Sequence, residues 1–519
     1  MSQPYPPHFE RPSQSPYNQY INQPNNFPPK KRRGRFWIWL AGAAIVLLLA
    51  FAASMALAYK FYTTSQKVID GNQDKSFLET VRGVTKDNHK PLRGEDRGRI
   101  NILLVGLAGK NYPGTNLTDT IIIASVNPKT WQTALLSIPR DLFVPIPGTK
   151  LSTKINALYA RSEDTDASGK SGIDNLKETL TDITGQPIDY YIALDFDGFK
   201  QIIDELGGVK IQVPEDLHDE RYPGPNYSYQ IFDLKAGLQD LDGETALKYA
   251  RTRHDKGGDF GRAYRQQQIL EAARSKAYSL GTILNIPKIT GLLDTLGDHL
   301  RTNIQIEEMG SFLDLVEKID THTTINKVLD AGKPDSVMAV SHVFLGGVRA
   351  FILIPRVGDY SEIQDISKNI FDLDALARKQ KEVEDENASV AIVNESGTNG
   401  FDGKVNALFK KMGYDSKVIS ASHNRTIISQ TLLYDLTDGL KPFSLENLSK
   451  KLPAKIVSEN SMPENCKDFN LCLILGSDLT DRLNYEENSV EDLESGYDQD
   501  KIDEKSFIDL LKKGSSVKY

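Results

Sequence analysis

The stretch YARTRHDKGGDFGRAYRQQQ, residues 249–268, combines arginines with glycines in a chain that is acidic as a whole. Arg251 and Arg253 are two positions apart, so on a strand their side chains would point the same way. Arg262 and Gln266 are four positions apart, so on a helix they share one face. Guanidinium groups pair well with phosphate oxygens, and a helix N-terminus adds N–H donors. The stretch therefore indicates a site for a phosphate-like anion, unless it is only a solvated basic face.

Two further blocks carry residue types suited to the same ligand. In VGLAGKNYPGTNLTDT, residues 105–120, a glycine-rich loop follows an apolar strand, and Asp119 opens the next strand. Such loops let the backbone approach a phosphate closely, although this one has neither a Lys-Ser/Thr pair nor a GxGxxG pattern. In SIPRDLFVPIPG, residues 137–148, a strand delivers Arg140 and Asp141 at its C-terminal end, where open α/β sheets place their ligands. A surface turn and a structural salt bridge are the respective alternatives.

A fourth block, TKINALYA at residues 153–160, adds a cation and an amide through Lys154 and Asn156. Its alternative interpretation is an ordinary helix start. Asp259 precedes the helix that carries Arg262 and could cap its N-terminus. These blocks need a scaffold that brings residues far apart in the sequence to one place.

Short apolar, β-branched runs begin at Ile100, as expected of strands that are buried on both faces. Between them, GFKQIIDELGG places its apolar residues on one helical face and ends in two glycines that suit a helix C-terminus. Strands that alternate with helices predict one large layered α/β domain with a central, mostly buried sheet over residues 96–375. The predicted strands are residues 100–106, 120–126, 133–139, 190–195, 209–213 and 349–355, and the predicted helices are 198–208, 262–280 and segments within 286–320.

A second, smaller α/β domain is predicted for residues 389–479, after a charged linker at 376–388. Its first part, SVAIVNESGTNGFDGKVNALFKKMGYDSKVIS, predicts a strand, a glycine-rich turn, a helix and a strand. Residues 424–434 and 470–476 add further strand candidates, and residues 480–519 form an acidic tail.

The chain has two cysteines, Cys466 and Cys472, which are too few for a disulfide-stapled scaffold. Because they are six positions apart, they could form one local bridge in an oxidising compartment. In the alternative interpretation, Cys472 is an apolar core residue and Cys466 has no special role.

Residues 36–58, FWIWLAGAAIVLLLAFAASMALA, are 23 residues without a charge. At about 1.5 Å per residue, such a helix spans the roughly 30 Å hydrocarbon core of a bilayer. The basic KKRRGR before it predicts a cytoplasmic N-terminus. A cleaved signal peptide is the alternative, but this apolar run is longer than that of a signal peptide. We therefore expect a disordered basic cytoplasmic tail at 1–35, a transmembrane helix at 36–58, a stalk at 59–95 and extracytoplasmic domains after it, in a single-pass protein of the cell membrane.

The chain has a formal charge of −8, although residues 1–35 are basic. A global nucleic-acid binder is disfavoured, because phosphate binding usually needs a broad basic surface. No DNA-reading motif occurs in residues 1–35, and their basic run is better explained by membrane topology or anionic lipid. A transcription regulator is therefore disfavoured as well.

Six motifs occur in one order along the chain: NILLVG, LTDTIIIASVNP, LLSIPRDLFVPIPG, KINALYA, DGFKQIIDELGGV and GLQDLDGETALKYARTRHDKGGDFGRAYRQQQ. Together they resemble the LytR-CpsA-Psr family, closely over residues 96–280 and on toward residue 375. VAIVNESGTNGFDGKV and LILGSD resemble the LytR C-terminal domain that often follows. The resemblance implies an αβα-layered fold with an apolar lipid pocket. It also implies an Mg²⁺-dependent phosphotransferase that moves a glycopolymer phosphate from a polyprenyl-pyrophosphate carrier to a sugar hydroxyl of peptidoglycan.

The resemblance places Asp119 on the second of two metal-binding aspartates. Ala108 stands where the family usually has the first, and Leu117 stands where a basic residue is expected. Arginines suit the implied reaction, because phosphoryl transfer depends mostly on positioning and on neutralising charge. Motifs and resemblance together assign Arg140, Arg251, Arg253, Asp259 and Arg262 as catalytic groups, Lys154, Asn156, Arg265 and Gln266 as substrate-binding groups, and Asp119 as the Mg²⁺ ligand.

Two functions stay open at this point. The first is a membrane-anchored transferase that acts on a polyprenyl-pyrophosphate-linked glycopolymer and on peptidoglycan or a related wall acceptor. The second is a non-catalytic envelope protein that binds polyprenyl phosphate or wall polymer, and Ala108 favours it. Because one carboxylate is lost, the Mg²⁺ site would be weaker, or completed by pyrophosphate oxygens and water, or absent.

Overall fold

The structure is a computed structural model, and the chain divides into two compact units, Met1–Tyr59 and Lys60–Tyr519. The predicted cytoplasmic tail and transmembrane helix belong to the first unit and lie outside the described residues. Within the described ranges, no helix is both long enough and apolar enough to cross a bilayer. The structure describes residues 59–60, 62–63, 65–70, 90–112, 114, 116–161, 170–224, 228–252, 258–279, 295–319, 324–331, 336–345, 348–420, 427–457, 464–483 and 485.

A six-stranded sheet is built around the apolar runs that begin at Ile100. Its strands are β1 (Ile100–Leu107), β2 (Thr118–Val126), β3 (Thr133–Ser137), β6 (Tyr190–Asp195), β11 (Leu300–Thr302) and β12 (Ile325–Val328). The strand order is β11-β6-β1-β2-β3-β12. β1 runs antiparallel to β2 and parallel to β6, so the sheet is mixed. Every residue of β3 is buried, which confirms the expectation from its apolar sequence.

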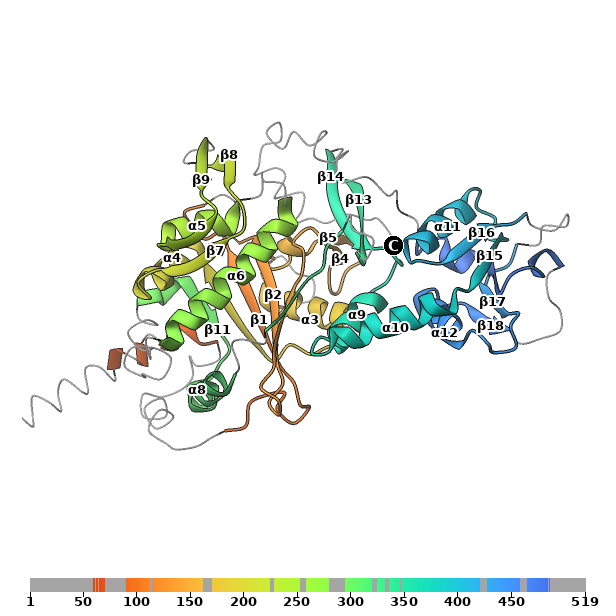
Figure 1. The fold of residues 1–519 in the computed structure, drawn as a ribbon. Coiled ribbons are helices and arrows are strands. Elements are labelled where there is room, and N and C mark those ends of the chain that lie inside the picture. Colours follow the sequence, from red (N-terminus) through yellow and green to blue (C-terminus); the bar gives the residue numbers. More distant parts are fainter. Residues whose placement is uncertain are drawn as a thin grey trace, which may run out of the picture. The chain divides into compact units, whose positions relative to one another are not determined.

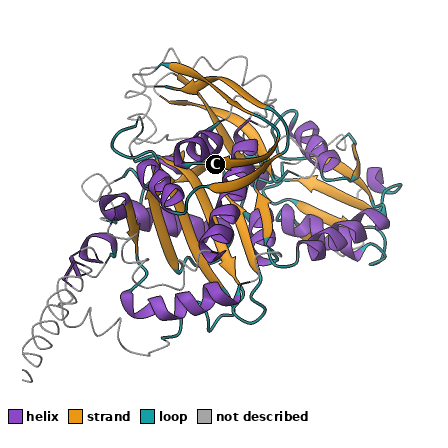
Figure 2. Cartoon of the chain, turned by 60° about the vertical axis from the view of Figure 1, so that its left-hand side comes forward, coloured by secondary structure: helices purple, strands orange, loops and turns teal. Residues whose placement is uncertain are grey.

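Helices cover both faces of this sheet (Figures 1 and 2). The helices of this part of the chain are α3 (Gly172–Thr184), α4 (Phe196–Glu205), α5 (Gly243–Arg251), α6 (Gly258–Ser279), α8 (Met309–Lys318) and α9 (Ser361–Lys368). On one face, Leu180 of α3 and Ile363 of α9 share an apolar core with Ile121 of β2. On the other face, Leu270 of α6 packs against a cluster that contains Ile122. Neighbouring residues of β2 therefore face different helices, as the two-residue period of a strand requires.

Two predicted strands lie outside the central sheet. VKIQV forms β7 (Val209–Val213), which pairs with β10 (Gly237–Leu241) in a separate two-stranded sheet, so its assignment to the central set is wrong. Its buried and exposed residues alternate, as they do in a strand with one face in water. RAFILIP lies in β14 (Val348–Pro355), which forms an antiparallel hairpin with β13 (Met338–Leu345).

The segment 286–320 is predicted to be helical, and its described residues include a strand. Among its described residues, Leu300–Thr302 form strand β11, and α8 is the α-helix that follows. Two short hairpins complete this part of the chain, one of β4 with β5 and one of β8 with β9. These smaller elements are β4 (Phe143–Pro145), β5 (Ser152–Lys154), β8 (Leu217–Pro223), β9 (Tyr229–Leu234) and the 3-10 helices η1 (Ile155–Ala157), η4 (Gly297–His299) and η5 (Ile306–Glu308).

Residues 68–70 of the predicted stalk, 59–95, contact strand β11 of the sheet. Val68 and Ile69 are buried in one apolar cluster with Leu300 of β11. The N–H of Asp70 donates to the carbonyl of Thr302 at 2.8 Å. Residues 68–70 of the stalk segment are therefore part of the folded unit.

A five-stranded sheet forms a second layered region. Its elements are β15 (Ser389–Asn394), α11 (Phe401–Lys411), β16 (Asp415–Val418), β17 (Leu432–Asp435), α12 (Pro442–Lys451), β18 (Lys455–Val457), η7 (Glu464–Cys466), β19 (Leu471–Leu475) and η8 (Ser477–Leu479). The strand order is β16-β15-β19-β17-β18. The order strand, turn, helix, strand over β15 to β16 confirms the prediction for this segment. The charged stretch predicted as a linker is largely the helix α10 (Leu373–Glu386).

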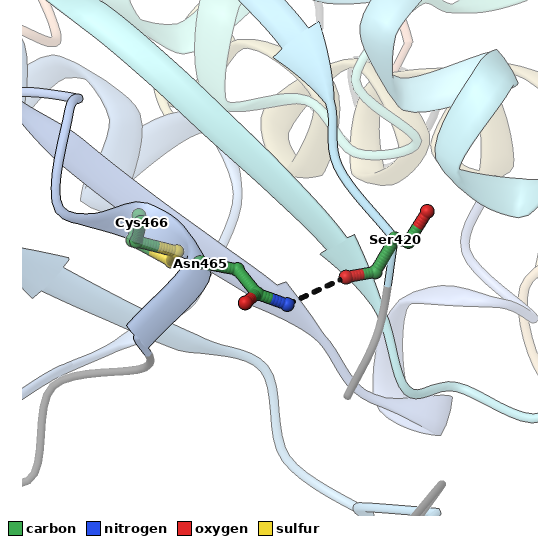
Figure 3. Close-up of a disulfide and its surroundings, with 4 residues drawn as sticks. Ser420, Asn465 and Cys466 are labelled. Atoms are coloured by element: carbon green, nitrogen blue, oxygen red, sulfur yellow. Dashed lines mark hydrogen bonds between the residues drawn. A yellow bond between two sulfur atoms is a disulfide. The ribbon is translucent and has the colours of Figure 1, made fainter. Parts of the chain in front are cut away.

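Cys466 and Cys472 form a disulfide, with an S–S distance of 2.00 Å. Both residues are buried in an apolar cluster with Ala391 of β15. Figure 3 shows the bridge beside Asn465, whose Nδ2 donates to the carbonyl oxygen of Ser420 at 3.0 Å. The structure therefore agrees with the interpretation in which Cys466 and Cys472 form one local disulfide.

Candidate active site

Several strand ends meet at one edge of the central sheet. β1 and β6 run parallel and both end there, with Leu107 opposite Asp195. β2 begins there and β3 ends there, because each runs antiparallel to the strand before it. This edge therefore gathers the glycine-rich loop after β1, Asp119 of β2 and Arg140 after β3, as expected for the ligand edge of an α/β sheet.

Arg140 is held between two carboxylates. Its Nη1 donates to Oδ1 of Asp119 at 2.8 Å, and its Nε lies 3.4 Å from Oδ2 of Asp141. Asp141 also pairs with Lys154, whose Nζ lies 2.6 Å from Asp141 Oδ1. The side chains of Arg140 and Asp119 are 16% and 25% exposed. The guanidinium of Arg140 is thus fixed in place, and part of it remains at the surface.

Asp119 is a carboxylate among three guanidinium groups. Burial alone would raise the pKa of Asp119, but attraction to Arg140, Arg262 and Arg251 outweighs burial and lowers this pKa below its ordinary value. We call Asp119, Arg140, Arg251 and Arg262 the arginine cluster. Because one negative charge faces three positive charges, the cluster is suited to an anion of more than one charge.

Lys154 and Asn156, which we predicted to bind substrate, are both buried. The ammonium of Lys154 pairs with Asp141, and the N–H of Asn156 donates to the carbonyl of Arg140 at 3.2 Å. The side-chain oxygen of Asn156 is buried without a hydrogen-bond partner. The structure therefore connects both residues to the support of Arg140.

Arg251 is the last residue of the helix α5. The two-residue spacing of Arg251 and Arg253 suggested a strand, and this interpretation is wrong for Arg251. The helix starts at a cap, where the side chain of Asp242 accepts from the N–H of Thr245 at 2.8 Å. Ala246 and Ala250 form part of its buried face. The helix positions Arg251 at the edge of the apolar core.

Arg265 and Gln266, which we also predicted to bind substrate, hold the end of α5. Nε of Arg265 donates to the carbonyl of Tyr249 at 3.0 Å, and its Nη2 donates to the carbonyl of Thr252. Nε2 of Gln266 donates to the carbonyl of Ala250 at 3.3 Å. Carbonyls in the last turn of a helix have no partner within the helix, so α6 supplies the missing donors. Both side chains thereby fix the turn that carries Arg251.

Arg262 lies in α6, is 7% exposed, and acts on Asp119 through its charge. Arg253 and the side chain of Asp259 lie outside the described residues. Their catalytic roles stay predictions. The helix α6 begins at Gly258, so the prediction that Asp259 precedes the helix as its cap is wrong.

Three aromatic residues that the sequence analysis did not single out surround Arg251. Its Cζ lies 4.4 Å from the ring centroid of Phe196 and 5.5 Å from those of Tyr112 and Tyr222. Tyr112 belongs to the glycine-rich loop, so an aromatic residue in that loop was a usable signal. For Tyr222, on β8, the sequence offered no signal.

The surroundings of Ala108 do not fit a two-aspartate metal site. Ala108 is 3% exposed and packs with Phe196 and Leu247 in an apolar cluster. Asp119, the other implied ligand, has one of its oxygens bonded to Arg140. In the described part of the chain, no group of three or more His, Cys, Asp or Glu residues could hold a metal ion. An Mg²⁺ ion at Asp119 stays a prediction.

Comparison with known proteins gives relatives over the same region. The chain is 35% identical over 273 residues to the Bacillus subtilis protein named polyisoprenyl-teichoic acid–peptidoglycan teichoic acid transferase TagV, covering 51% of this chain and 64% of that protein. It is 30% identical over 291 residues to the Oceanobacillus iheyensis protein of the same activity named TagU, covering 54% of this chain and 82% of that protein. The crystal structure of B. subtilis TagV matches with 29% identity and a TM-score of 0.41, over 53% of this chain and 97% of that chain. A model of the LytR_cpsA_psr family matches residues 56–341, more than half of the sequence, and the chain belongs to this family.

Proposed function

We propose that the chain transfers a glycopolymer phosphate from a polyprenyl-pyrophosphate carrier to a hydroxyl of peptidoglycan or a related envelope acceptor. The observation that carries this proposal is the arginine cluster, in which the guanidinium groups of Arg140, Arg251 and Arg262 act on Asp119 at the ligand edge of the sheet. The names of the relatives TagV and TagU, which are teichoic acid transferases, support the same reaction class.

In the proposed step, the acceptor hydroxyl attacks the phosphorus that carries the polymer. The new P–O bond joins the polymer phosphate to the acceptor, and the bond between that phosphorus and the bridging oxygen breaks. The bridging oxygen stays on the second phosphorus, so polyprenyl phosphate leaves. The hydroxyl proton passes to a base, for which Asp259 is the predicted group. Negative charge grows on the bridging and equatorial oxygens, and fixed cations stabilise it without having to reorganise. Hydrogen bonds to Asp119 and to the Tyr222 hydroxyl fix the guanidinium groups of Arg140 and Arg251.

We propose that the protein is anchored in the cell membrane by residues 36–58, with the domains that follow outside the cytoplasm. The basic residues before this segment and its apolar length support the orientation. The disulfide between Cys466 and Cys472 supports it as well, because disulfides persist in oxidising compartments and are rare in the cytosol. We propose the five-stranded region as a LytR C-terminal domain that contacts wall polymer or a partner.

A second candidate function is a protein that binds the lipid-linked polymer without transferring it. The apolar packing of Ala108 favours this candidate, because it removes a carboxylate that the resemblance expects.

A transfer assay separates the two functions. The full chain in membrane nanodiscs is given a polyprenyl-pyrophosphate-linked glycopolymer and peptidoglycan, and lipid and wall products are followed by mass spectrometry. We expect polyprenyl phosphate to appear together with polymer-modified peptidoglycan. Carrier that is bound and recovered intact would support the binding protein, and an absence of carrier binding would contradict both functions.

A further inference from the structure

The guanidinium of Arg251 is surrounded by rings instead of carboxylates. Phe196, Tyr112 and Tyr222 lie within 4.4 to 5.5 Å of its Cζ, and we call these three residues the aromatic box. One N–H, on Nη1, donates to the hydroxyl of Tyr222 at 3.2 Å. Arg251 forms no ion pair with any carboxylate in the described part of the chain. Its charge is therefore held in place without being paired.

Tyr112 is fixed by contacts between its loop and the start of α4. Gly109, with φ of +90°, lies so close to Asp195 that an added Cβ would be 3.0 Å from the Asp195 Cβ. Further along, Asn111 donates to Asp197 at 2.9 Å, and Nζ of Lys200 donates to the Tyr112 hydroxyl at 3.0 Å. The loop is thereby attached to α4 at several points, and its tyrosine ring is held.

Phe196 forms the second wall of the box. It is 6% exposed, and its ring meets the ring of Tyr112 edge to face, with centroids 5.1 Å apart and an interplanar angle of 81°. Edge-to-face packing is a favourable geometry for two rings. The two rings therefore orient each other before either contacts Arg251.

Tyr222 reaches the box because β8 is irregular. The pairing of β8 with β9 shifts register between Asp219 and Tyr222. Glu220 and Arg221 are consecutive and both exposed, after which Tyr222 is buried. Without the shift, the two-residue period would turn Arg221 inward and Tyr222 outward. A bulge that redirects one side chain is a recurrent feature beside active sites.

Aromatic rings and carboxylates differ in how much of an arginine's charge and how many of its N–H donors they leave available to a ligand. A carboxylate pairs with the charge and uses the N–H donors. An aromatic ring attracts the cation through its quadrupole, stacks on the guanidinium plane, and leaves the edge donors free. Ala108 belongs to the same apolar cluster as Phe196 and Tyr112, so its methyl group extends the box. The position where the resemblance expects a carboxylate therefore contributes to the apolar packing around Phe196 and Tyr112.

We propose that Tyr112, Phe196 and Tyr222 are positioning residues that present Arg251, as an unpaired cation, to the pyrophosphate of the carrier. This inference rests on the proposed function, because it assigns the anion that Arg251 meets. It extends that function by naming what orients the arginine. Figure 1 shows α4, α5 and β8, the regular elements that supply Phe196, Arg251 and Tyr222, in one part of the fold.

The test is a double-mutant cycle on inorganic pyrophosphate binding, measured by calorimetry with the full chain in detergent and EDTA. Tyr112→Leu removes a half-buried ring, and we expect binding to weaken by roughly tenfold, or about 1.4 kcal/mol, which lies within the range of a cation–π contact. Tyr112→Phe keeps the ring and should weaken binding much less. In the background of Arg251→Gln, Tyr112→Leu should have no further effect.

Tyr229→Leu is the matched control. Tyr229 lies on β9 and is 51% exposed, so its loss should leave pyrophosphate binding unchanged. Melting temperatures of all variants show whether they fold, and Phe196→Leu adds a second ring variant where it folds.

The outcomes separate this inference from the proposed function. If the wild-type chain binds pyrophosphate neither in EDTA nor with added Mg²⁺, the proposed function fails. If the wild type binds and Tyr112→Leu binds equally well, the aromatic box is overturned while the function stands. Equal weakening by Tyr112→Leu with and without Arg251 would also overturn the box, since the ring would then act independently of the arginine.

Discussion

Two arginines at one edge of the same sheet are held by opposite chemistry. Arg140 lies between Asp119 and Asp141, so its charge is largely paired. Arg251 lies among rings and donates to a neutral hydroxyl, so its charge stays available. Because the free energy of an anion in the site depends on unpaired charge, Arg251 should matter most for binding. Arg140 should matter most for the geometry of Asp119 and the loop around it.

The largest expected effect comes from removing the unpaired cation. Arg251→Ala should lower the rate of polymer transfer by about 100- to 1000-fold, the usual effect of losing one fixed donor to a developing charge. Transfer assays with saturating carrier measure it. A loss of less than tenfold would contradict the comparison, because Arg251 would then not contribute more than a paired arginine.

A large effect on stability should come from the paired side. Asp141→Asn leaves the buried ammonium of Lys154 without its partner, and breaking such a pair costs roughly 3 kcal/mol or more. Urea unfolding of the full chain in detergent measures this free energy. The control is Asp240→Asn, since Asp240 and Lys210 form an exposed pair whose loss should cost about 1 kcal/mol or less. Equal costs for the two variants would show that the Asp141 pair does not act as a buried one.

A third arginine, Arg356, is held by a buried carboxylate, and acid should weaken this ion pair. Arg356 and Lys451 both pair with Glu362, which is 5% exposed. Burial would raise the pKa of Glu362, but hydrogen bonding and attraction from Arg356 and Lys451 outweigh it and lower that pKa. This stabilisation is therefore fully present above about pH 4.3, the unfolded value, and is lost as the pH falls through the lower folded value.

The measurement for Glu362 is the free energy of unfolding of wild type and Glu362→Gln between pH 7 and pH 3. We expect the difference between them to be largest near pH 7 and to shrink in acid. A difference that grows as the pH falls would contradict the sign of the shift.

The smallest expected effect separates the ring of Tyr222 from its hydroxyl. Tyr222→Phe keeps the ring beside Arg251 and removes one hydrogen bond, worth about 1 kcal/mol. Pyrophosphate affinity should fall by roughly fivefold, the factor that this free energy gives. A loss as large as that of Arg251→Ala would show that the hydroxyl, and not the ring, orients the arginine.

Much of the fold could be predicted because local signals agreed with it. β6 has the bounds of the run YYIALD, since a short apolar segment between polar residues has few alternatives. The five-residue strand VKIQV was assigned to the wrong sheet. Its alternation of apolar and polar residues indicates one solvated face, which is typical of a strand outside a fully buried sheet.

The charged residues of the site could be predicted from the sequence. The residues that hold those charged side chains in position could not. Arg140 and Asp119 were assigned from motifs, and the structure brings them together at 2.8 Å. Arg265 and Gln266 were assigned to substrate, because a sequence does not show that their partners are the carbonyls at the end of α5. Tyr222 could not be found, because its direction depends on a bulge that only the pairing with β9 creates.

The most direct test is a crystal structure of the chain with a polyprenyl-pyrophosphate analogue and Mg²⁺. The account predicts pyrophosphate oxygens on the free N–H groups of Arg251, with the guanidinium still between its three rings and Arg140 still bonded to Asp119. The same map shows whether Asp119 takes an Mg²⁺ ion through its other oxygen. Pyrophosphate bound away from Arg251, or Arg251 turned out of the rings toward a carboxylate, would contradict the account.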